Sequence, residues 1–247
     1  MRKRLEEAGE MAKTFGKRQS YLVESALMPE LEELFCEHAG QAAVSAGTVA
    51  RVYLDSGDRS LARSIAGGAG TKHCIWIEGT SAAHLEDGAA LVHAQWGGLF
   101  PSTVRCSISS RDALLLARGE AFVHNRLGRS VRSLVRQVGS LRPAFFASLE
   151  TEAWCSQEQD LSISILRSMR CRTHALNLAS AAGAEVLPEG TLLIEPCHAV
   201  SLPGWMAGYL EDAGAEPCTM GADSLALQQY LSQTLPCPEL LGAPVGA

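Results

Sequence analysis

The stretch that decides the fold is HCIWIEGTSAAHLEDGAALVHAQWGGLF, residues 73–100. Its apolar run from Cys74 to Ile77 predicts a buried strand, which breaks at Glu78-Gly79-Thr80. The residues that follow predict a helix with Thr80 or Ser81 as its N-cap. A strand that turns into a helix often holds a phosphate, because the helix start offers free N–H groups. The same turn has an ordinary structural interpretation, which we favour.

The composition indicates a globular protein with enough apolar material for a buried core. Apolar residues make up 47% of the 247 residues and charged residues 19%. The formal net charge of -6 argues against a general nucleic-acid binder. No apolar run reaches the roughly 18 to 20 residues that cross a bilayer, and the basic start lacks the apolar core of a secretory signal. We therefore expect a cytoplasmic protein with neither membrane nor nucleic acid as a partner.

Strand-like and helix-like segments alternate along the chain, which predicts an α/β or α+β fold. We expect a mixed sheet with flanking helices, plus a smaller C-terminal helix-strand region in which a helix ending at Ala182 precedes the strand TLLIEP. A shift to Ser, Gln and Glu after Trp154 marks the main domain boundary. The predicted parts are an N-terminal helical segment, 1–47, an α/β domain, 48–155, a C-terminal α/β subdomain, 156–236, and a loose tail, 237–247.

Two cysteine-histidine pairs form the first candidate site. Cys171 and His174 lie one turn apart on the predicted helix, so both could face a metal ion. Cys197 and His198 could complete a zinc site if the chain turns after Pro196, or could form a nucleophilic site of their own. None of the eight cysteines lies in a C-x-x-C pair. We therefore favour core cysteines beside surface histidines, and we expect no metal and no cofactor.

An arginine stripe is the second candidate site. Arg126, Arg129, Arg132 and Arg136 follow one another at spacings of three, three and four, which places them on one face of a helix. In an acidic protein such a stripe favours an acidic partner or anion, although a solvated helix face has the same pattern. The stripe is therefore our predicted partner-binding surface.

Four segments carry a resemblance to a known family: VYLDSGD (52–58), IWIEGTSAAHLEDGAALV (75–92), SSRDALLLARG (109–119) and LRPAFFASLETEAW (141–154). The set resembles the effector-adaptor chaperones of bacterial type VI secretion. In that family one strand ends in Leu-Asp, a second runs into Gly-Thr and a helix, and a late segment carries paired aromatics and a Trp. The sequence departs from that pattern where Ala89-Ala90 replace the usual Pro-Tyr, and where the arginines lack a following Asp-Pro.

The resemblance implies a non-enzymatic adaptor that binds an effector protein and delivers it to a secretion spike protein, with the arginine stripe as the docking surface. The residues leave one alternative open, a small α/β enzyme with its site near Cys197 and His198. Open α/β sheets bind ligands at the carboxyl ends of their strands, which favours that location. Because the sequence holds no compact catalytic signature, the adaptor is the first prediction.

Overall fold

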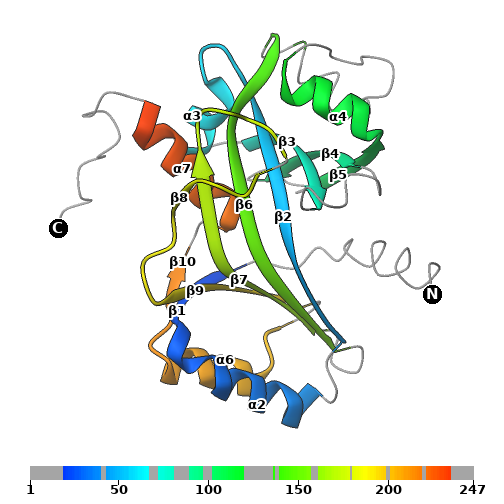
Figure 1. Ribbon diagram of the computed structural model, residues 1–247. Coiled ribbons are helices and arrows are strands. Elements are labelled where there is room, and N and C mark those ends of the chain that lie inside the picture. Colours follow the sequence, from blue (N-terminus) through cyan, green and yellow to red (C-terminus); the bar gives the residue numbers. More distant parts are fainter. Residues whose placement is uncertain are drawn as a thin grey trace, which may run out of the picture. The chain divides into compact units, whose positions relative to one another are not determined.

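A computed structural model gives the fold of the chain. It describes residues 19–39, 43–66, 72–80, 89–96, 102–119, 136, 139–156, 161–178, 180–198, 201–218 and 221–234. The strands in these segments are β1 (Ser20–Glu24), β2 (Ala43–Ser56), β3 (Lys72–Thr80), β4 (Ala89–Trp96), β5 (Ser102–Ile108), β6 (Leu141–Ser156), β7 (Leu161–Arg172), β8 (Ala184–Glu185), β9 (Thr191–His198) and β10 (Glu216–Cys218) (Figure 1). Their hydrogen-bonded order is β10-β1-β9-β7-β6-β2-β3-β4-β5, and β8 pairs with β7. The α+β class is confirmed, with one large antiparallel sheet.

The helices are few and short compared with the strands. They are the 3-10 helix η2 (Ser25–Leu27) and the α-helices α2 (Met28–Ala39), α3 (Ser60–Ala66), α4 (Ser110–Ala117), α6 (Gly204–Asp212) and α7 (Ala222–Thr234). Among the described helices none is long and apolar enough to cross a bilayer.

Contacts divide the chain into two compact units, each built from discontinuous segments. Unit 1 comprises Met1–Ala46, Thr151–Arg167 and Leu187–Gly221, and unit 2 comprises Gly47–Glu150, Ser168–Val186 and Ala222–Ala247. The three longest strands, β2, β6 and β7, contribute residues to both units. The domain boundaries expected from composition stay a prediction.

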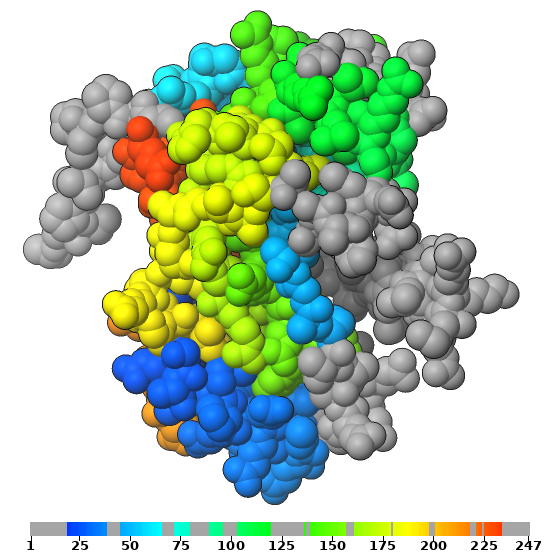
Figure 2. Space-filling model, in the orientation of Figure 1, coloured from blue at the N-terminus to red at the C-terminus, as the bar shows by residue number. Residues whose placement is uncertain are grey.

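Unit 1 is held by a small apolar core under two helices. β1 pairs antiparallel with β10 on one side and β9 on the other, so that Tyr21 lies opposite both Pro217 and Ile194. Phe35 of α2 packs edge-on against Trp154, with 5.3 Å between ring centroids. The opposite side of α2 is at the surface (Figure 2), and most of its exposed residues are acidic. The amphipathic spacing therefore buries one face of α2 and solvates the other.

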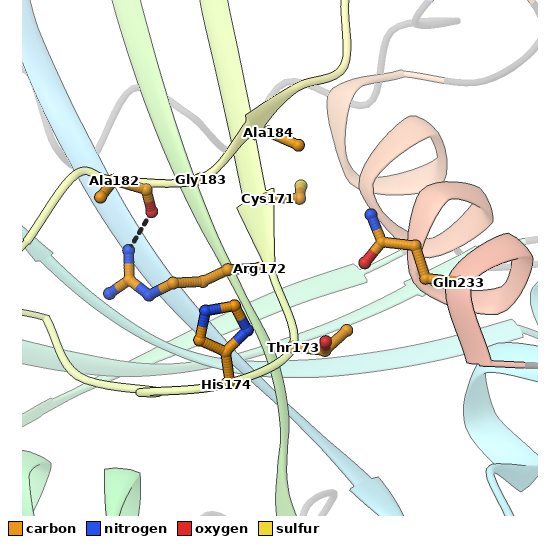
Figure 3. A pocket seen from close by; sticks show the side chains of 8 residues that line it. All are labelled: Cys171, Arg172, Thr173, His174, Ala182, Gly183, Ala184 and Gln233. Carbon is orange, nitrogen blue, oxygen red and sulfur yellow. Dashed lines mark hydrogen bonds between the residues drawn. The ribbon is translucent and has the colours of Figure 1, made fainter.

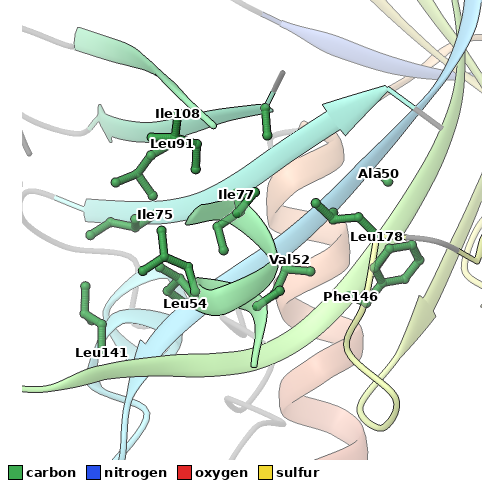
Figure 4. Close-up of a cluster of buried hydrophobic side chains, with 14 of the residues drawn as sticks. Ala50, Val52, Leu54, Ile75, Ile77, Leu91, Ile108, Leu141, Phe146 and Leu178 are labelled. Carbon is green, nitrogen blue, oxygen red and sulfur yellow. The ribbon is translucent and has the colours of Figure 1, made fainter. Parts of the chain in front are cut away.

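The sheet of unit 2 has two different faces, because successive strand residues point to opposite sides. One face is apolar: Val52 and Leu54 of β2 join Ile75 and Ile77 of β3 in a buried cluster (Figure 4). Helix α4 covers this cluster with three buried residues, Ala113, Leu116 and Ala117. The intervening residues of β2 and β3 carry polar and aromatic side chains to the other face. That second face carries the candidate site.

The stretch 73–100 does not turn from strand to helix at Gly79. β3 continues through Glu78 and Gly79 to Thr80, and residues 89–92 form the start of β4, which runs antiparallel to β3 with Ile77 opposite Leu91. The helix prediction is wrong for residues 89–92, and its residues 81–88 lie outside the described part. Because the sheet is covered on both faces, β3 is buried without alternation between apolar and polar residues. A short apolar run of this kind does not distinguish a strand from a helix.

The segment VYLDSGD has a local structural role. The carboxylate of Asp55 accepts hydrogen bonds from the backbone N–H groups of Ser56, Leu61 and Ala62, at 2.7 to 3.1 Å. The bonds from Leu61 and Ala62 satisfy free donors at the start of α3. Burial raises the pKa of Asp55 against the opposing effect of these bonds. The Leu-Asp pair therefore ends a core strand and caps the helix that follows.

A buried histidine in β4 makes unit 2 sensitive to acid. The ring of His93 is 3% exposed and its Nε2 lies 3.1 Å from Nδ1 of His73. Burial, with a smaller contribution from the neighbouring His73, lowers the pKa of His93 from 6.5 to about 4. Unfolded chains therefore bind this proton below pH 6.5, whereas the folded chain resists it until about pH 4.

We expect the free energy of unfolding to fall by about 3 kcal/mol between pH 6.5 and pH 4, because each unit of pKa difference is worth about 1.4 kcal/mol. Urea unfolding followed at several pH values measures the fall. His93→Gln should remove this part of the slope, while His174→Gln, at an exposed position in the same unit, should retain it. Equal slopes in the wild type and His93→Gln would show that His93 is not the cause.

Candidate functional site

The second face of the unit 2 sheet gathers charged side chains from β2, β3, β5 and α7. Arg51 comes from β2, Glu78 from β3, Arg105 from β5 and Asp223 from the first turn of α7. Together they bring two cations and two carboxylates to one place. We call this set the charged cluster.

Hydrogen bonds connect the charged cluster without a break. Arg51 Nε donates to Glu78 Oε2 at 2.9 Å, and Arg51 Nη1 donates to Asp223 Oδ1 at 2.6 Å. Arg105 Nη1 donates to the second oxygen of Glu78, and Trp76 Nε1 donates to Oε2 at 3.0 Å. The Glu78 side chain is 10% exposed, whereas the Arg105 side chain is 64% exposed. The cluster therefore reaches from the covered side of the sheet to solvent.

The electrostatics of the cluster keep its charges in place. Burial alone would raise the pKa of Glu78, but the charges of Arg51 and Arg105 outweigh it and lower that pKa below its ordinary value. Burial opposes the charge on Arg51, yet Asp223, Tyr53 and Glu78 raise the pKa of its guanidinium. An arginine that stays charged in a covered place is a strong recognition group for anions.

An aromatic ladder lies beside the charged cluster on the same face. Tyr53 stacks on Phe145 of β6 with 4.3 Å between ring centroids, and Phe145 stacks on Tyr230 of α7 with 4.8 Å. Trp76 lies next to Tyr53, and the guanidinium of Arg51 is 5.0 Å from its ring centroid. The hydroxyl of Tyr53 donates to Asp223 Oδ1 at 2.5 Å. Burial, and to a smaller extent the charge of Asp223, raises the pKa of Tyr53.

A cavity of about 350 Å³ lies elsewhere in unit 2 and is lined by Cys171, Arg172, Thr173, His174, Ala182, Gly183, Ala184 and Gln233 (Figure 3). The guanidinium of Arg172 donates to four backbone carbonyls of the loop after β7, including that of Ala182 (dashed in Figure 3). It also lies 3.5 Å from the ring centroid of Phe146. Arg172 is therefore used to hold the loop rather than to bind a ligand.

The two cysteine-histidine pairs of the first candidate site do not lie on a helix. Cys171 lies in strand β7, so the predicted helix ending at Ala182 is wrong there, and His174 is exposed in the loop that follows. Burial raises the pKa of the Cys171 thiol to about 12, which disfavours a reactive thiolate. β9 continues through Cys197 to His198, so the chain does not turn after Pro196. Among the described residues no three side chains from His, Cys, Asp and Glu gather for a metal.

The arginine stripe falls almost entirely outside the described residues. Arg126, Arg129 and Arg132 lie there, while Arg136 is described and exposed. Its role as a partner-binding surface stays a prediction.

Sequence reasoning missed the charged cluster, although one signal was present. Glu78 directly follows a strongly apolar run in β3 and is itself buried, and a buried carboxylate needs partners. Its partners could not be read from the sequence, because Arg51 and Arg105 each lie 27 positions away, on other strands.

No protein-family model matches the sequence, and no curated protein matches it either. Among solved structures, a protein from Hippeastrum, described as an adenylyl cyclase candidate with a dominant triphosphatase activity, has a TM-score of 0.52 at 12% identity over 92% of this chain and 99% of that chain. An adenylate cyclase candidate from Bacillus halodurans has a TM-score of 0.48 at 13% identity, over 88% of each chain. The capping-enzyme triphosphatase of Mimivirus has 0.43 at 8% identity, over 87% of this chain and 97% of that chain.

The resemblance to type VI effector-adaptor chaperones is wrong, and with it the adaptor function that the resemblance implied. Its second segment requires a strand that runs into a helix, whereas residues 75–80 and 89–92 belong to two antiparallel strands. Its last segment, 141–154, lies within the long strand β6. Instead, 92% of this chain matches the Hippeastrum protein, so that the two proteins share a fold.

Proposed function

We propose that unit 2 binds a triphosphate group at Arg51 and Arg105 and that the protein acts as an enzyme of the triphosphatase class. The observation that carries the proposal is a pair of arginines on one covered face of a sheet whose fold is shared with a protein described as having a dominant triphosphatase activity. We place this activity in the cytoplasm, which agrees with the absence of any long apolar run in the sequence.

Arginine suits this role on chemical grounds. A guanidinium presents several N–H donors in a planar fork that matches phosphate oxygens, and it stays charged at any physiological pH. Arg105 is exposed enough to meet a ligand, and Arg51 is held in place by Trp76 and Glu78. Because phosphoryl transfer depends mainly on positioning and on stabilising negative charge, two such cations can contribute to catalysis as well as to binding.

The described residues do not fit a divalent cation. Such an ion takes several oxygen ligands, usually carboxylates. Both oxygens of Glu78 accept hydrogen bonds from Arg51, Arg105 or Trp76, and Oδ1 of Asp223 accepts two more. In the described segments no group of three potential metal ligands exists.

This mismatch favours a second candidate function, a protein that binds a triphosphate group without hydrolysing it. The two functions share the arginines and differ only in turnover. Release of inorganic phosphate from tripolyphosphate and from nucleoside triphosphates, with Mg²⁺ or Mn²⁺ added, separates them. Turnover supports the triphosphatase, and binding without turnover supports the second function.

Titration calorimetry with tripolyphosphate tests the binding that both functions require. We expect Arg105→Gln to weaken binding about 10- to 100-fold, since a charged hydrogen bond is worth about 1.5 to 3 kcal/mol. The fold should survive, because this side chain is largely exposed. Arg111→Gln removes an exposed arginine from α4, which covers the apolar face, and should bind as the wild type does. Absence of binding, or equal binding by Arg105→Gln, would contradict the proposal.

A further inference from the structure

Helix α7 places two of its side chains on the polar face of the unit 2 sheet. Asp223 in its first turn accepts hydrogen bonds from Arg51 and from the hydroxyl of Tyr53. Tyr230 stacks on Phe145 with an angle of 15° between the rings. One helix thus supplies a negative charge to the charged cluster and a flat ring to the aromatic ladder.

The spacing of these two groups has a chemical meaning. Seven residues separate Asp223 from Tyr230, which corresponds to about 10 Å along a helix that rises about 1.5 Å per residue. A nucleoside triphosphate likewise carries a flat aromatic base at one end and negatively charged phosphates at the other. Of these two groups of α7, Arg51 contacts the charged one and Phe145 the flat one.

We propose that α7 occupies a nucleoside triphosphate site as an internal substitute, with Asp223 in the place of a phosphate and Tyr230 in the place of the base. The inference rests on the proposed function and deepens it, because it names the substrate class and adds a means of regulation. When α7 withdraws, Arg51 and Arg105 bind the phosphates and the ring of Phe145, itself stacked on Tyr53, receives the base.

The aromatic ladder favours a nucleoside triphosphate over inorganic triphosphate. Stacking of a base on an aromatic side chain is worth about 1 to 3 kcal/mol, and an inorganic chain cannot gain it. The same contacts hold α7 in place, together with its buried Ala226, Leu227 and Leu231. A ligand must therefore displace a packed helix. Its apparent affinity is reduced in proportion to the fraction of molecules in which α7 has withdrawn from the site.

Binding of ATP and of tripolyphosphate to the full chain tests the inference through variants in α7. Asp223→Asn removes the competing charge with little change in shape, and we expect both ligands to bind about tenfold more tightly. Ser232→Ala changes an exposed residue of the same helix and should leave both affinities unchanged. Phe145→Leu removes the stacking surface and should reduce the preference for ATP over tripolyphosphate by about tenfold.

Hydrogen exchange gives a readout that a purely structural helix would not produce. Saturating ATP should speed exchange of the α7 amides, because the ligand replaces the helix, whereas ordinary ligand binding slows exchange. Unchanged affinities in Asp223→Asn, or slower exchange of α7 with ATP, would overturn the inference. If tripolyphosphate binds and depends on Arg105 but ignores Asp223, only this inference fails. If neither ligand binds any variant, the proposed function fails with it.

Discussion

Arg172→Met is expected to destabilise unit 2 by about 4 kcal/mol or more. The Arg172 residue is only 7% exposed, and its guanidinium satisfies the carbonyls of Ala175, Asn177, Ser180 and Ala182. A hydrogen bond from a charged donor is worth about 1.5 to 3 kcal/mol, and water replaces part of the four bonds because the accepting loop residues are exposed. Methionine retains an apolar contact with the ring of Phe146 but replaces none of the donors.

Urea unfolding of the two strand variants Arg172→Met and Arg170→Met measures the difference. Arg170 lies two positions earlier in β7, is 47% exposed and forms an exposed ion pair with Glu185. Such a pair is worth about 0 to 1 kcal/mol, so Arg170→Met should unfold nearly as the wild type does. Arg172→Lys keeps the charge but lacks the planar fork of donors. We therefore expect it to lose most of the unfolding free energy that Arg172→Met loses. Equal stability of the two methionine variants would show that the loop is held by other contacts.

Trp76→Ala should cost unit 2 about 3 to 5 kcal/mol, the usual range for a buried aromatic residue replaced by alanine. Trp76 is 4% exposed, lies beside Tyr53 and under the guanidinium of Arg51, and donates to Glu78. The substitution therefore opens a cavity and removes one partner of a buried carboxylate.

Trp76→Phe separates these two causes. Phenylalanine fills most of the space but cannot donate to Glu78, so it should cost about 1 to 3 kcal/mol. Thermal and urea unfolding of both variants give the measurement. If Trp76→Ala unfolds at the same temperature and urea concentration as the wild type, β3 does not belong to the core of unit 2.

Several elements could be predicted because their sequence pattern is local. β2 ends at Ser56, where the turn-forming residues Gly57 and Asp58 follow. In β5, apolar residues at 104, 106 and 108 alternate with polar ones, and Ser109 caps α4 by accepting from the N–H of Asp112. The strand TLLIEP lies within β9. Alternating apolar residues, turn residues and caps act over a few positions, so a single stretch contains the information.

The two wrong helices have different causes. Residues 89–92 are all buried, and a run that is buried on both faces loses the period of two residues that identifies a strand. Pairing with distant strands, rather than local preference, decides the conformation there. β7 keeps that period over Leu161–Ile165, so its sequence does carry a strand pattern that the helix prediction missed.

The sequence by itself determined that strands and helices share the fold, as α/β or α+β, and it also determined the apolar segments of the core and the buried position of Trp76. Only the tertiary structure decided that Arg51, Glu78 and Asp223 meet, since 27 and 172 positions separate Arg51 from its two partners. The sequence shows which residues are charged but not which of them meet. The partner of each charged side chain depends on which strands pair and on which face of the sheet the side chain lies. Strand register and the placement of α7 therefore create the candidate site.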